Sequence, residues 1–183
     1  MKHTDIRTLC EGAICIALTI LLSYLEIKFA WNGEGGSVSV AMLPLVIFAV
    51  RYGVAKGIGV GAVAGFLKFI LANGVALHWV SILFDYAGAY ALVGLAGCFR
   101  GKWKALPWAA LLGGLARFAM HFLSGITVYA SYMPEQFLNQ TMTSVPFYSF
   151  LYNGLYMFPS IALTVLLSFA LRKPLAQFFQ NLK

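Results

Sequence analysis

The stretch WVSILFDYAGAYALVGLAGCF, Trp79 to Phe99, decides the fold class of this sequence. Of its 21 residues only Asp85 carries a charge. A helix of about 20 largely apolar residues, rising about 1.5 Å per residue, is long enough to cross a lipid bilayer. The stretch therefore predicts a transmembrane helix that holds one carboxylate within the membrane.

The composition of the whole chain agrees with a membrane protein. Hydrophobic residues make up 61% and charged residues 10% of the 183 residues, whereas soluble domains are about half apolar and a quarter charged. A chain of this length accommodates roughly six spans with short connections. We expect an all-α membrane protein, a six-transmembrane-helix bundle in which residues 1–183 form a single integral membrane domain.

The apolar segments mark the expected spans, and the second of them is too short to cross the bilayer squarely. A glycine-rich turn, FAWNGEGGS, joins the first two segments, and small residues from Gly53 to Gly65 predict close helix packing. The six segments are Leu9–Leu25, Val38–Val50, Val54–Ala72, Trp79–Phe99, Leu106–Tyr129 and Val145–Leu171.

The basic residues predict the orientation of the bundle. If six spans are counted, one side of the membrane receives only Lys28, and the other receives Lys2, Arg7, Arg51, Lys56, Arg100, Lys102, Lys104, Arg172, Lys173 and Lys183. By the positive-inside rule both termini are cytoplasmic, and the loops around Trp31, 73–78 and 131–144 face outward. Topology thus accounts for the net charge of +7, and we expect no nucleic-acid partner.

Several chemical classes lack their signatures. The three cysteines, Cys10, Cys15 and Cys98, are odd in number and lie in or beside apolar segments, which predicts buried free thiols and no metal site. The sequence contains no GxxxxGK[ST], HExxH or GxSxG motif. Nucleotide hydrolysis by a phosphate loop and the commoner metalloprotease and serine-hydrolase classes thus lack their signatures, and we expect no metal and no cofactor.

Three polar residues are predicted to lie at one depth. Counting about 1.5 Å per residue from the outer surface places Asp85 about 9 Å deep, and His121 and Asn153 about 12 Å deep. An intramembrane carboxylate is costly, so Asp85 should face the bundle interior with a partner. Gly88, Ala89, Ser124 and Gly125 leave room beside Asp85 and His121.

Aromatic residues cluster at the same level, which favours a flat, positively charged organic ligand between aromatic faces and one carboxylate. These residues are Tyr86, Tyr129, Tyr148, Tyr152 and, in the preceding loop, Trp31.

Each feature has a purely structural alternative. Asp85 pairs in that case with Arg117 or Lys68, His121 is a satisfied core histidine, and Asn153 joins helices. The aromatic residues would then form an interfacial belt. At the opposite end of the molecule, Ala13 and Ala17 form a small-xxx-small pair that allows close approach of a partner helix or serves internal packing.

Taken together, EGAICIA, GGSVSVAMLPLVIFAVRYG, LFDYAGAYALVGLAG, RFAMHFLSGITVY and YSFLYNG resemble one family, in order over nearly the whole chain. They resemble the thiamine-specific substrate-binding (S) subunit of energy-coupling-factor (ECF) vitamin transporters. The resemblance implies a six-helix subunit of the prokaryotic plasma membrane that captures thiamine, vitamin B1, from outside. It also implies docking on a transmembrane coupling subunit driven by two cytoplasmic ABC ATPases.

The resemblance further implies roles for individual residues. Asp85 and Tyr86 match the acidic residue and tyrosine of the family's fourth helix, and His121 matches the histidine of its fifth. Tyr148 and Asn153 match the sixth helix, while Trp31 is similar to a loop tryptophan that closes over the ligand. Ala13 and Ala17 match the docking surface for the coupling subunit.

Two positions depart from the family pattern and keep alternatives open. Family members carry Glu where this chain has Asp85 and Trp where it has Tyr129, and an aromatic wall residue is replaced near Ala64. The first alternative is an S component for another vitamin or a thiamine precursor. The second, from a different class, is an intramembrane acid/base enzyme that uses Asp85 and His121.

Overall fold

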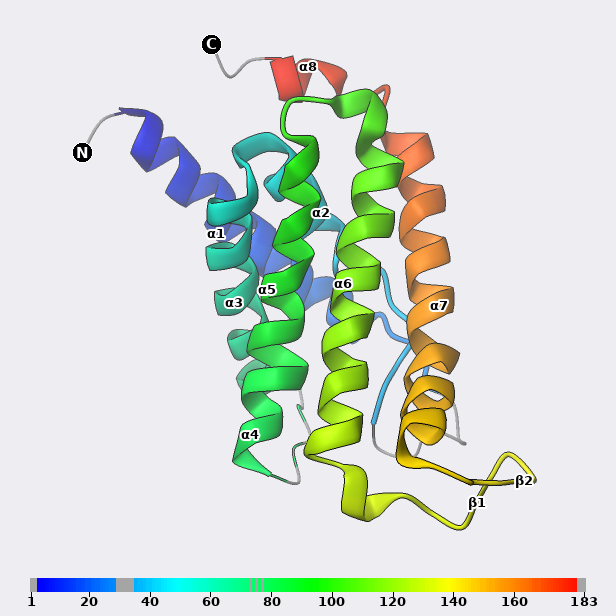
Figure 1. Ribbon diagram of the computed structural model, residues 1–183. Helices are drawn as coiled ribbons and strands as arrows, with labels where there is room; N and C mark the ends of the chain where they lie inside the picture. The colour runs from blue at the N-terminus through cyan, green and yellow to red at the C-terminus, as the bar shows by residue number, and fades with distance from the viewer. Residues whose placement is uncertain (1–2, 29–34, 73, 75, 77, 181–183) are drawn as a thin grey trace.

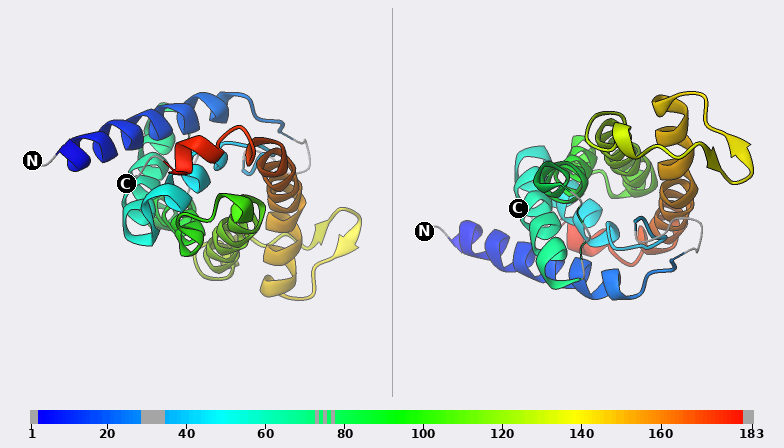
Figure 2. Two further views of the ribbon diagram at one scale, coloured as in Figure 1. Left: turned by 90° about the horizontal axis from the view of Figure 1, so that it is seen from above. Right: turned by 90° about the horizontal axis from the view of Figure 1, so that it is seen from below.

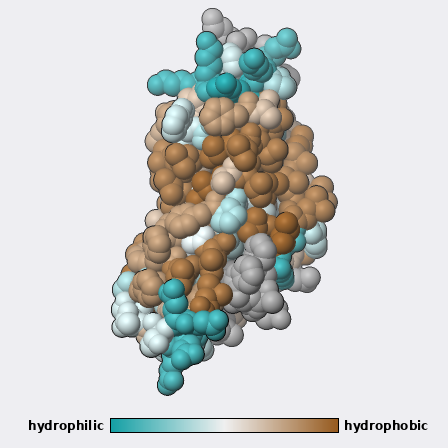
Figure 3. Space-filling model, turned by 90° about the vertical axis from the view of Figure 1, so that its right-hand side faces the viewer, coloured by the Kyte–Doolittle hydropathy of each residue, from teal (hydrophilic) through white to brown (hydrophobic). Residues whose placement is uncertain are grey.

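The structure, a computed structural model, describes residues 3–28, 35–72, 74, 76 and 78–180. Within these residues, five helical segments are long and apolar enough to cross a membrane: Asp5–Tyr24, Val54–Leu71, Trp79–Phe99, Trp103–Thr127 and Val145–Leu171. A sixth helix, Leu43–Tyr52, is apolar but shorter. A hydrophobic belt lies between two more polar ends (Figure 3). The all-helical membrane architecture expected from the sequence is confirmed.

The elements follow one another in an up-and-down order, and the described ends of the chain lie at the same end of the bundle (Figure 1). The first three helices are α1 (His3–Tyr24), α2 (Leu43–Tyr52) and α3 (Val54–Leu71). The fourth crossing consists of α4 (Trp79–Ser81), η2 (Ile82–Gly88), α5 (Ala89–Val93) and η3 (Gly94–Phe99). The rest comprises η4 (Trp103–Ala105), α6 (Leu106–Thr127), η5 (Ala130–Tyr132), β1 (Gln136–Phe137), β2 (Gln140–Thr141), α7 (Val145–Leu171) and α8 (Ala176–Gln180).

Helix α2 forms the centre of the core. Nine of its ten residues are buried, and the longer helices surround it when the bundle is viewed along its axis (Figure 2). Extended chain precedes α2 and is tied to the end of α1 by reciprocal 2.9 Å backbone hydrogen bonds between Ile27 and Val38. The second crossing is thus part helix and part extended chain, which explains why its apolar segment is short. Backbone of this kind is tolerated at membrane depth where protein surrounds it.

Glycines bring α3 into backbone contact with the fourth crossing. A Cβ at Gly61 would lie 2.2 Å from the carbonyl oxygen of Tyr90, and one at Gly65 would lie 2.1 Å from that of Tyr86. Gly57 likewise faces the Cα of Gly94. The predicted close packing of this small-residue segment is confirmed, and it places Tyr86 and its neighbour Asp85 against α3.

The fourth crossing is not the regular α-helix that its uniform hydropathy suggests. Residues Ile82–Gly88 form a π-helix, in which the Ala89 N–H donates to the carbonyl of Phe84, five residues earlier. Segments of this kind are rare and occur often at functional sites. Here the wider turn contains Asp85.

At the end of the bundle opposite the described chain ends, a short hairpin and an N-cap precede α7. Ser144 accepts a hydrogen bond from the Phe147 N–H and caps α7, whose first turn contains Pro146. Before it, β1 and β2 pair in a two-residue hairpin with positive φ at Leu138 and Asn139.

The cysteines are free, but the prediction that all three are buried is wrong. Cys10 and Cys98 are exposed and Cys15 is partly buried. The bundle presents apolar side chains outward to the bilayer, so an apolar segment alone does not predict which of its faces is buried.

Candidate functional site

A cavity of about 420 Å³ lies among the helices. Its lining includes residues of the connection between α6 and α7, which lies at the end of the bundle opposite the described chain ends (Figure 1). This volume lies in the range of about 300 to 1,000 Å³ typical of small-molecule sites. Seven tyrosines line it: Tyr86, Tyr90, Tyr129, Tyr132, Tyr148, Tyr152 and Tyr156. Five charged residues line it as well: Glu26, Lys28, Lys68, Asp85 and Arg117.

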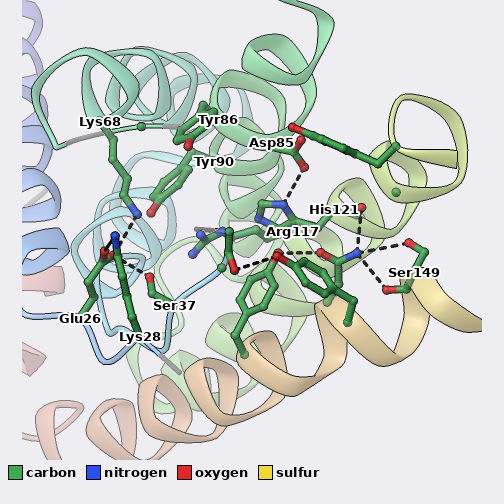
Figure 4. Close-up of a pocket in the computed structure, with 18 of the residues that line it drawn as sticks. Glu26, Lys28, Ser37, Lys68, Asp85, Tyr86, Tyr90, Arg117, His121 and Ser149 are labelled. Carbon is green, nitrogen blue, oxygen red and sulfur yellow. Dashed lines mark hydrogen bonds and ion pairs between the residues drawn. The ribbon is translucent and has the colours of Figure 1, made fainter. Parts of the chain in front are cut away.

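Asp85 is held by two side chains of α6. Its Oδ1 lies 3.0 Å from Nδ1 of His121 (Figure 4), and its Oδ2 accepts a 2.6 Å hydrogen bond from the Ser124 hydroxyl. Hydrogen bonds to an ionised acceptor are stronger than neutral ones. The carboxylate is therefore fixed in orientation at the cavity wall.

His121 is held at Nδ1 and open at Nε2. Its side chain is buried, and Nε2 has no hydrogen-bond partner within the described part of the chain. A buried polar atom without a partner costs free energy. Because His121 lines the cavity, a ligand is the natural partner for this nitrogen.

Asn153 joins α6 to α7. Its Nδ2 donates to the backbone carbonyls of His121 at 3.3 Å and Ser149 at 2.9 Å. Its Oδ1 accepts a 2.7 Å hydrogen bond from the Tyr156 hydroxyl. The structure thus gives Asn153 the helix-joining contacts of the structural alternative, although the residue also lines the cavity.

The basic residues near Asp85 are engaged with other groups. Nζ of Lys68 lies 3.8 Å from a Glu26 carboxylate oxygen, and the Arg117 guanidinium lies 4.2 Å from the centroid of the Tyr90 ring. Among the described residues, the ion pair of Asp85 is the one with His121. The alternative in which Asp85 pairs with Lys68 or Arg117 is not what the structure shows.

Glu26 forms the centre of a second charged cluster at the cavity wall. Besides Lys68, its carboxylate has Lys28 Nζ at 3.6 Å and accepts a 2.6 Å hydrogen bond from the Ser37 hydroxyl. This cluster joins the end of α1, the extended chain before α2, and α3 (Figure 4).

Aromatic rings form another wall. Tyr148 and Tyr152 on α7 have ring centroids 5.7 Å apart, and Phe137 of the hairpin packs against both at 5.4 and 5.8 Å. The Tyr152 hydroxyl donates to the Gly35 carbonyl at 2.9 Å, which fastens the extended chain to α7. Tyr86 packs edge-on against Phe69 of α3, with centroids 5.1 Å apart.

The predicted site residues can now be located. The cavity is lined by Asp85, Tyr86, His121, Tyr129, Tyr148 and Asn153, which come from the fourth crossing, α6, the residue before η5 and the first turns of α7. Trp31 lies outside the described residues. Ala13 and Ala17 are exposed on α1, away from the cavity, and Ala64 is buried in α3. The functional roles of all these residues stay predictions.

Sequence reasoning did not assign several lining residues to the cavity, namely Glu26, Lys28, Ser37, Lys68, Tyr90, Arg117, Tyr132, Ser149 and Tyr156. A signal existed for Tyr90 and Tyr156, which follow Tyr86 and Tyr152 by one helical turn and so share their faces. Arg117 precedes His121 by the same spacing. The partner of Glu26, Lys68, is distant in sequence, so spacing along one helix does not reveal this pair.

The groups gathered at the cavity are suited to binding a ligand. Within the described residues, no group of three or more His, Cys, Asp or Glu side chains is arranged to hold a metal ion. Aromatic faces, one oriented carboxylate and a buried imidazole nitrogen suit a flat, cationic heterocycle.

Comparisons with known proteins agree with one another. The family described as thiamine transporter protein (Thia_YuaJ) matches residues 9–180. The thiamine transporter ThiT of Bacillus subtilis (strain 168) is 32% identical over 165 residues, which are 83% of this chain and 83% of that protein. ThiT of Lacticaseibacillus paracasei is 27% identical over 169 residues, 84% of this chain and 80% of that protein. A solved structure of ThiT from Listeria monocytogenes has the same fold, with a TM-score of 0.81, 19% sequence identity, and coverage of 96% of this chain and 98% of that one.

Proposed function

Because the chain belongs to the thiamine transporter family, we propose that it takes up thiamine as the substrate-binding subunit of an energy-coupling-factor transporter. It is a multi-pass membrane protein and a transporter, not an enzyme. The observation that carries the assignment to this site is the tyrosine-lined cavity in which Asp85 is oriented by His121 and Ser124. Residues 1–183 form one integral membrane domain in this proposal.

The ligand occupies the cavity with its rings between aromatic faces. Tyr86, Tyr129 and Tyr148 supply these faces, since all three line the cavity. Asp85 faces the positive charge of thiamine, and Nε2 of His121 exchanges a hydrogen bond with it. Asn153 supports the site by joining α6 to α7, and Trp31 covers the ligand from its loop.

The expected orientation of the bundle in the membrane has the cavity open to the outside of the cell. The described chain ends lie together at one end of the bundle (Figure 1). The basic residues that the sequence assigns to one side of the membrane, such as Arg51, Arg100 and Lys102, lie at helix ends or in the connections between helices. By the positive-inside rule the end that holds the chain ends is cytoplasmic, so the cavity at the other end receives thiamine from outside.

Coupling takes place through α1. Ala13 and Ala17 are exposed on this helix, and small side chains allow another helix to approach closely. A transmembrane coupling subunit docks on this surface, and two cytoplasmic ABC ATPases supply the energy.

Titration of the purified chain with thiamine, followed by tryptophan fluorescence, tests the binding assignment. We expect saturable quenching that weakens at least about tenfold in Asp85→Ala and in His121→Ala, since each loses a charge-assisted contact. Quenching by a precursor or another vitamin, but not by thiamine, would reassign the ligand. No response to any of these ligands would return Asp85 to a structural role.

A separate experiment tests coupling. We expect Ala17→Trp to abolish uptake by the reconstituted complex while thiamine binding by the isolated subunit is unchanged, because the bulky ring blocks helix approach. Leu166→Trp, which puts the same ring at an exposed position of a different helix, α7, is the matched control. Normal uptake by Ala17→Trp would refute the docking assignment.

A further inference from the structure

A cluster of charged residues joins α1 to α2 near the end of the bundle that carries the described chain ends; Arg51 is fully buried and Glu11 mostly so, while Arg7 is half exposed. Arg51, in the last turn of α2, is fully buried, and its Nε lies 2.7 Å from Oε2 of Glu11 in α1. Its Nη2 also donates to Oε1 of Glu11 at 3.2 Å. Arg7, one turn earlier in α1, places its Nε 2.9 Å from Oε1 of the same carboxylate. Glu11 therefore joins two arginines from two helices.

The C-terminal helix α8 covers this cluster. The guanidinium carbon of Arg51 lies 3.7 Å from the centroid of the Phe178 ring, which is a close cation–π contact. Helix α8 lies across the end of the bundle (Figure 2). Arg51 is thus held on one side by the carboxylate of α1 and on another by the aromatic ring of α8.

The position of Glu11 on α1 connects the cluster to the opposite face of that helix. Glu11 and the buried Thr8, Gly12 and Thr19 face the bundle. The exposed face contains Ala13, Ile14, Ala17, Leu18 and Leu21. The Arg51 guanidinium meets both Glu11 oxygens, through one hydrogen bond at 3.2 Å and an ion pair at 2.7 Å, so it restrains the rotation of α1 about its own axis. That rotation decides where the exposed face points.

We infer that Arg51 is a positioning residue for transport: together with Glu11 and Phe178 it fixes α1 so that the face containing Ala13 and Ala17 meets the coupling subunit. The inference rests on the proposed function. The cavity lies at the other end of the bundle, so the cluster acts on coupling and leaves thiamine affinity unchanged. Helix α8 acts in this arrangement as the cover that keeps Arg51 in place.

Two native cysteines allow the position of α1 to be measured directly. Cys10 on α1 and Cys98 in η3 are exposed and free, so spin labels at these sites in the full-length Cys15→Ala chain report the α1 to η3 distance. We expect Phe178→Leu, which keeps an apolar side chain but loses the aromatic face, to broaden the distance distribution. Phe178→Trp keeps that face and should leave the distribution narrow. In Phe178→Leu, loss of the aromatic face shifts the ratio of molecules with α1 in its fixed position to molecules with α1 displaced by about 5- to 30-fold.

Uptake and binding are then measured in the same variants. We expect Phe178→Leu to lower thiamine uptake by at least about threefold, while thiamine affinity stays within about twofold of the parent chain. Glu11→Gln keeps the shape of the side chain and removes its charge. It should likewise broaden the distance distribution and lower thiamine uptake while thiamine affinity stays unchanged.

The outcomes separate this inference from the proposed function. Narrow distances together with normal uptake in both variants would overturn the positioning role, and so would a parallel loss of affinity and uptake, which indicates a general structural role. If the parent chain fails to bind thiamine, the proposed function fails by itself, whereas broadened distances in Phe178→Leu would still support the restraint on α1.

Discussion

Helix α3 packs so closely on the fourth crossing that the site should not tolerate a single methyl group at Gly65. A Cβ at this position would lie 2.1 Å from the carbonyl oxygen of Tyr86 and 2.6 Å from its carbonyl carbon. Both are backbone atoms of the residue that follows Asp85, so no side-chain rotation relieves the clash. Gly65→Ala must therefore displace the π-helical segment Ile82–Gly88 from α3.

The expected effect follows from the size of that displacement. Ordinary contact begins at 3.4 Å, so the two backbones must separate by about 1.3 Å. Overpacking of this kind typically costs about 1 to 3 kcal/mol. The unliganded protein can relieve the strain by moving Asp85 and Tyr86, whereas in the proposed site thiamine binding needs both residues in their present positions and so brings the strain back. Thiamine affinity should therefore fall by roughly 5- to 150-fold.

The assay is a fluorescence titration of the purified variants in detergent, with thermal unfolding measured in parallel. Gly59→Ala is the matched control, because it makes the same substitution in α3 at a position where a Cβ meets nothing within 4 Å. We expect Gly59→Ala to bind thiamine as the parent chain does. Equal affinities for Gly65→Ala and Gly59→Ala would refute the claim that close backbone packing positions the site.

Three smaller changes test other contacts of the site. Ser124→Ala removes the 2.6 Å hydrogen bond to Asp85 and should weaken thiamine binding by about 10- to 100-fold in the same titration; unchanged affinity would show that Ser124 does not orient the carboxylate. Tyr152→Phe removes the 2.9 Å hydrogen bond to Gly35 and should speed thiamine release by about 2- to 10-fold in stopped-flow measurements, and an unaltered release rate would contradict this fastening role. Ser144→Ala removes the N-cap of α7, which costs about 1 kcal/mol, so the unfolding temperature should fall by about 2 to 4 °C with little change in affinity; a stability equal to that of the parent would argue against the cap.

The common depth of three polar residues could be predicted from the sequence because the rise per residue of a helix is nearly constant. Asp85, His121 and Asn153 were expected at one level, and hydrogen bonds of 3.0 and 3.3 Å connect them in the structure. The close packing of the glycine-rich face of α3 could also be predicted from the sequence, since small residues at intervals of four share one side of a helix.

The parts that could not be predicted depend on contacts between distant segments. The π-helix at Ile82–Gly88 is one, because hydropathy does not distinguish it from an α-helix and its backbone packs on Gly65 of another helix. The pair between Glu26 and Lys68 is a second, because it joins the end of α1 to α3. The burial of Arg51 is a third: it was counted as a loop cation for topology, but it is fully buried and contacts Glu11 and Phe178.

Asp85 is oriented by its neighbours without a lysine or arginine in contact with it among the described residues. Within the described chain, Lys68 contacts Glu26 and Arg117 contacts Tyr90, whereas Asp85 contacts His121 and Ser124. A carboxylate held in this way among aromatic faces gains most from a cationic ligand. Asp85→Asn should therefore weaken binding of thiamine about tenfold more than binding of an analogue with a neutral ring in place of the thiazolium, because a hydrogen bond to a charged group is worth more than one between neutral groups. Titration of both ligands against both proteins measures this difference, and an equal loss for the two ligands would mean that Asp85 acts through hydrogen bonding alone, not through its charge.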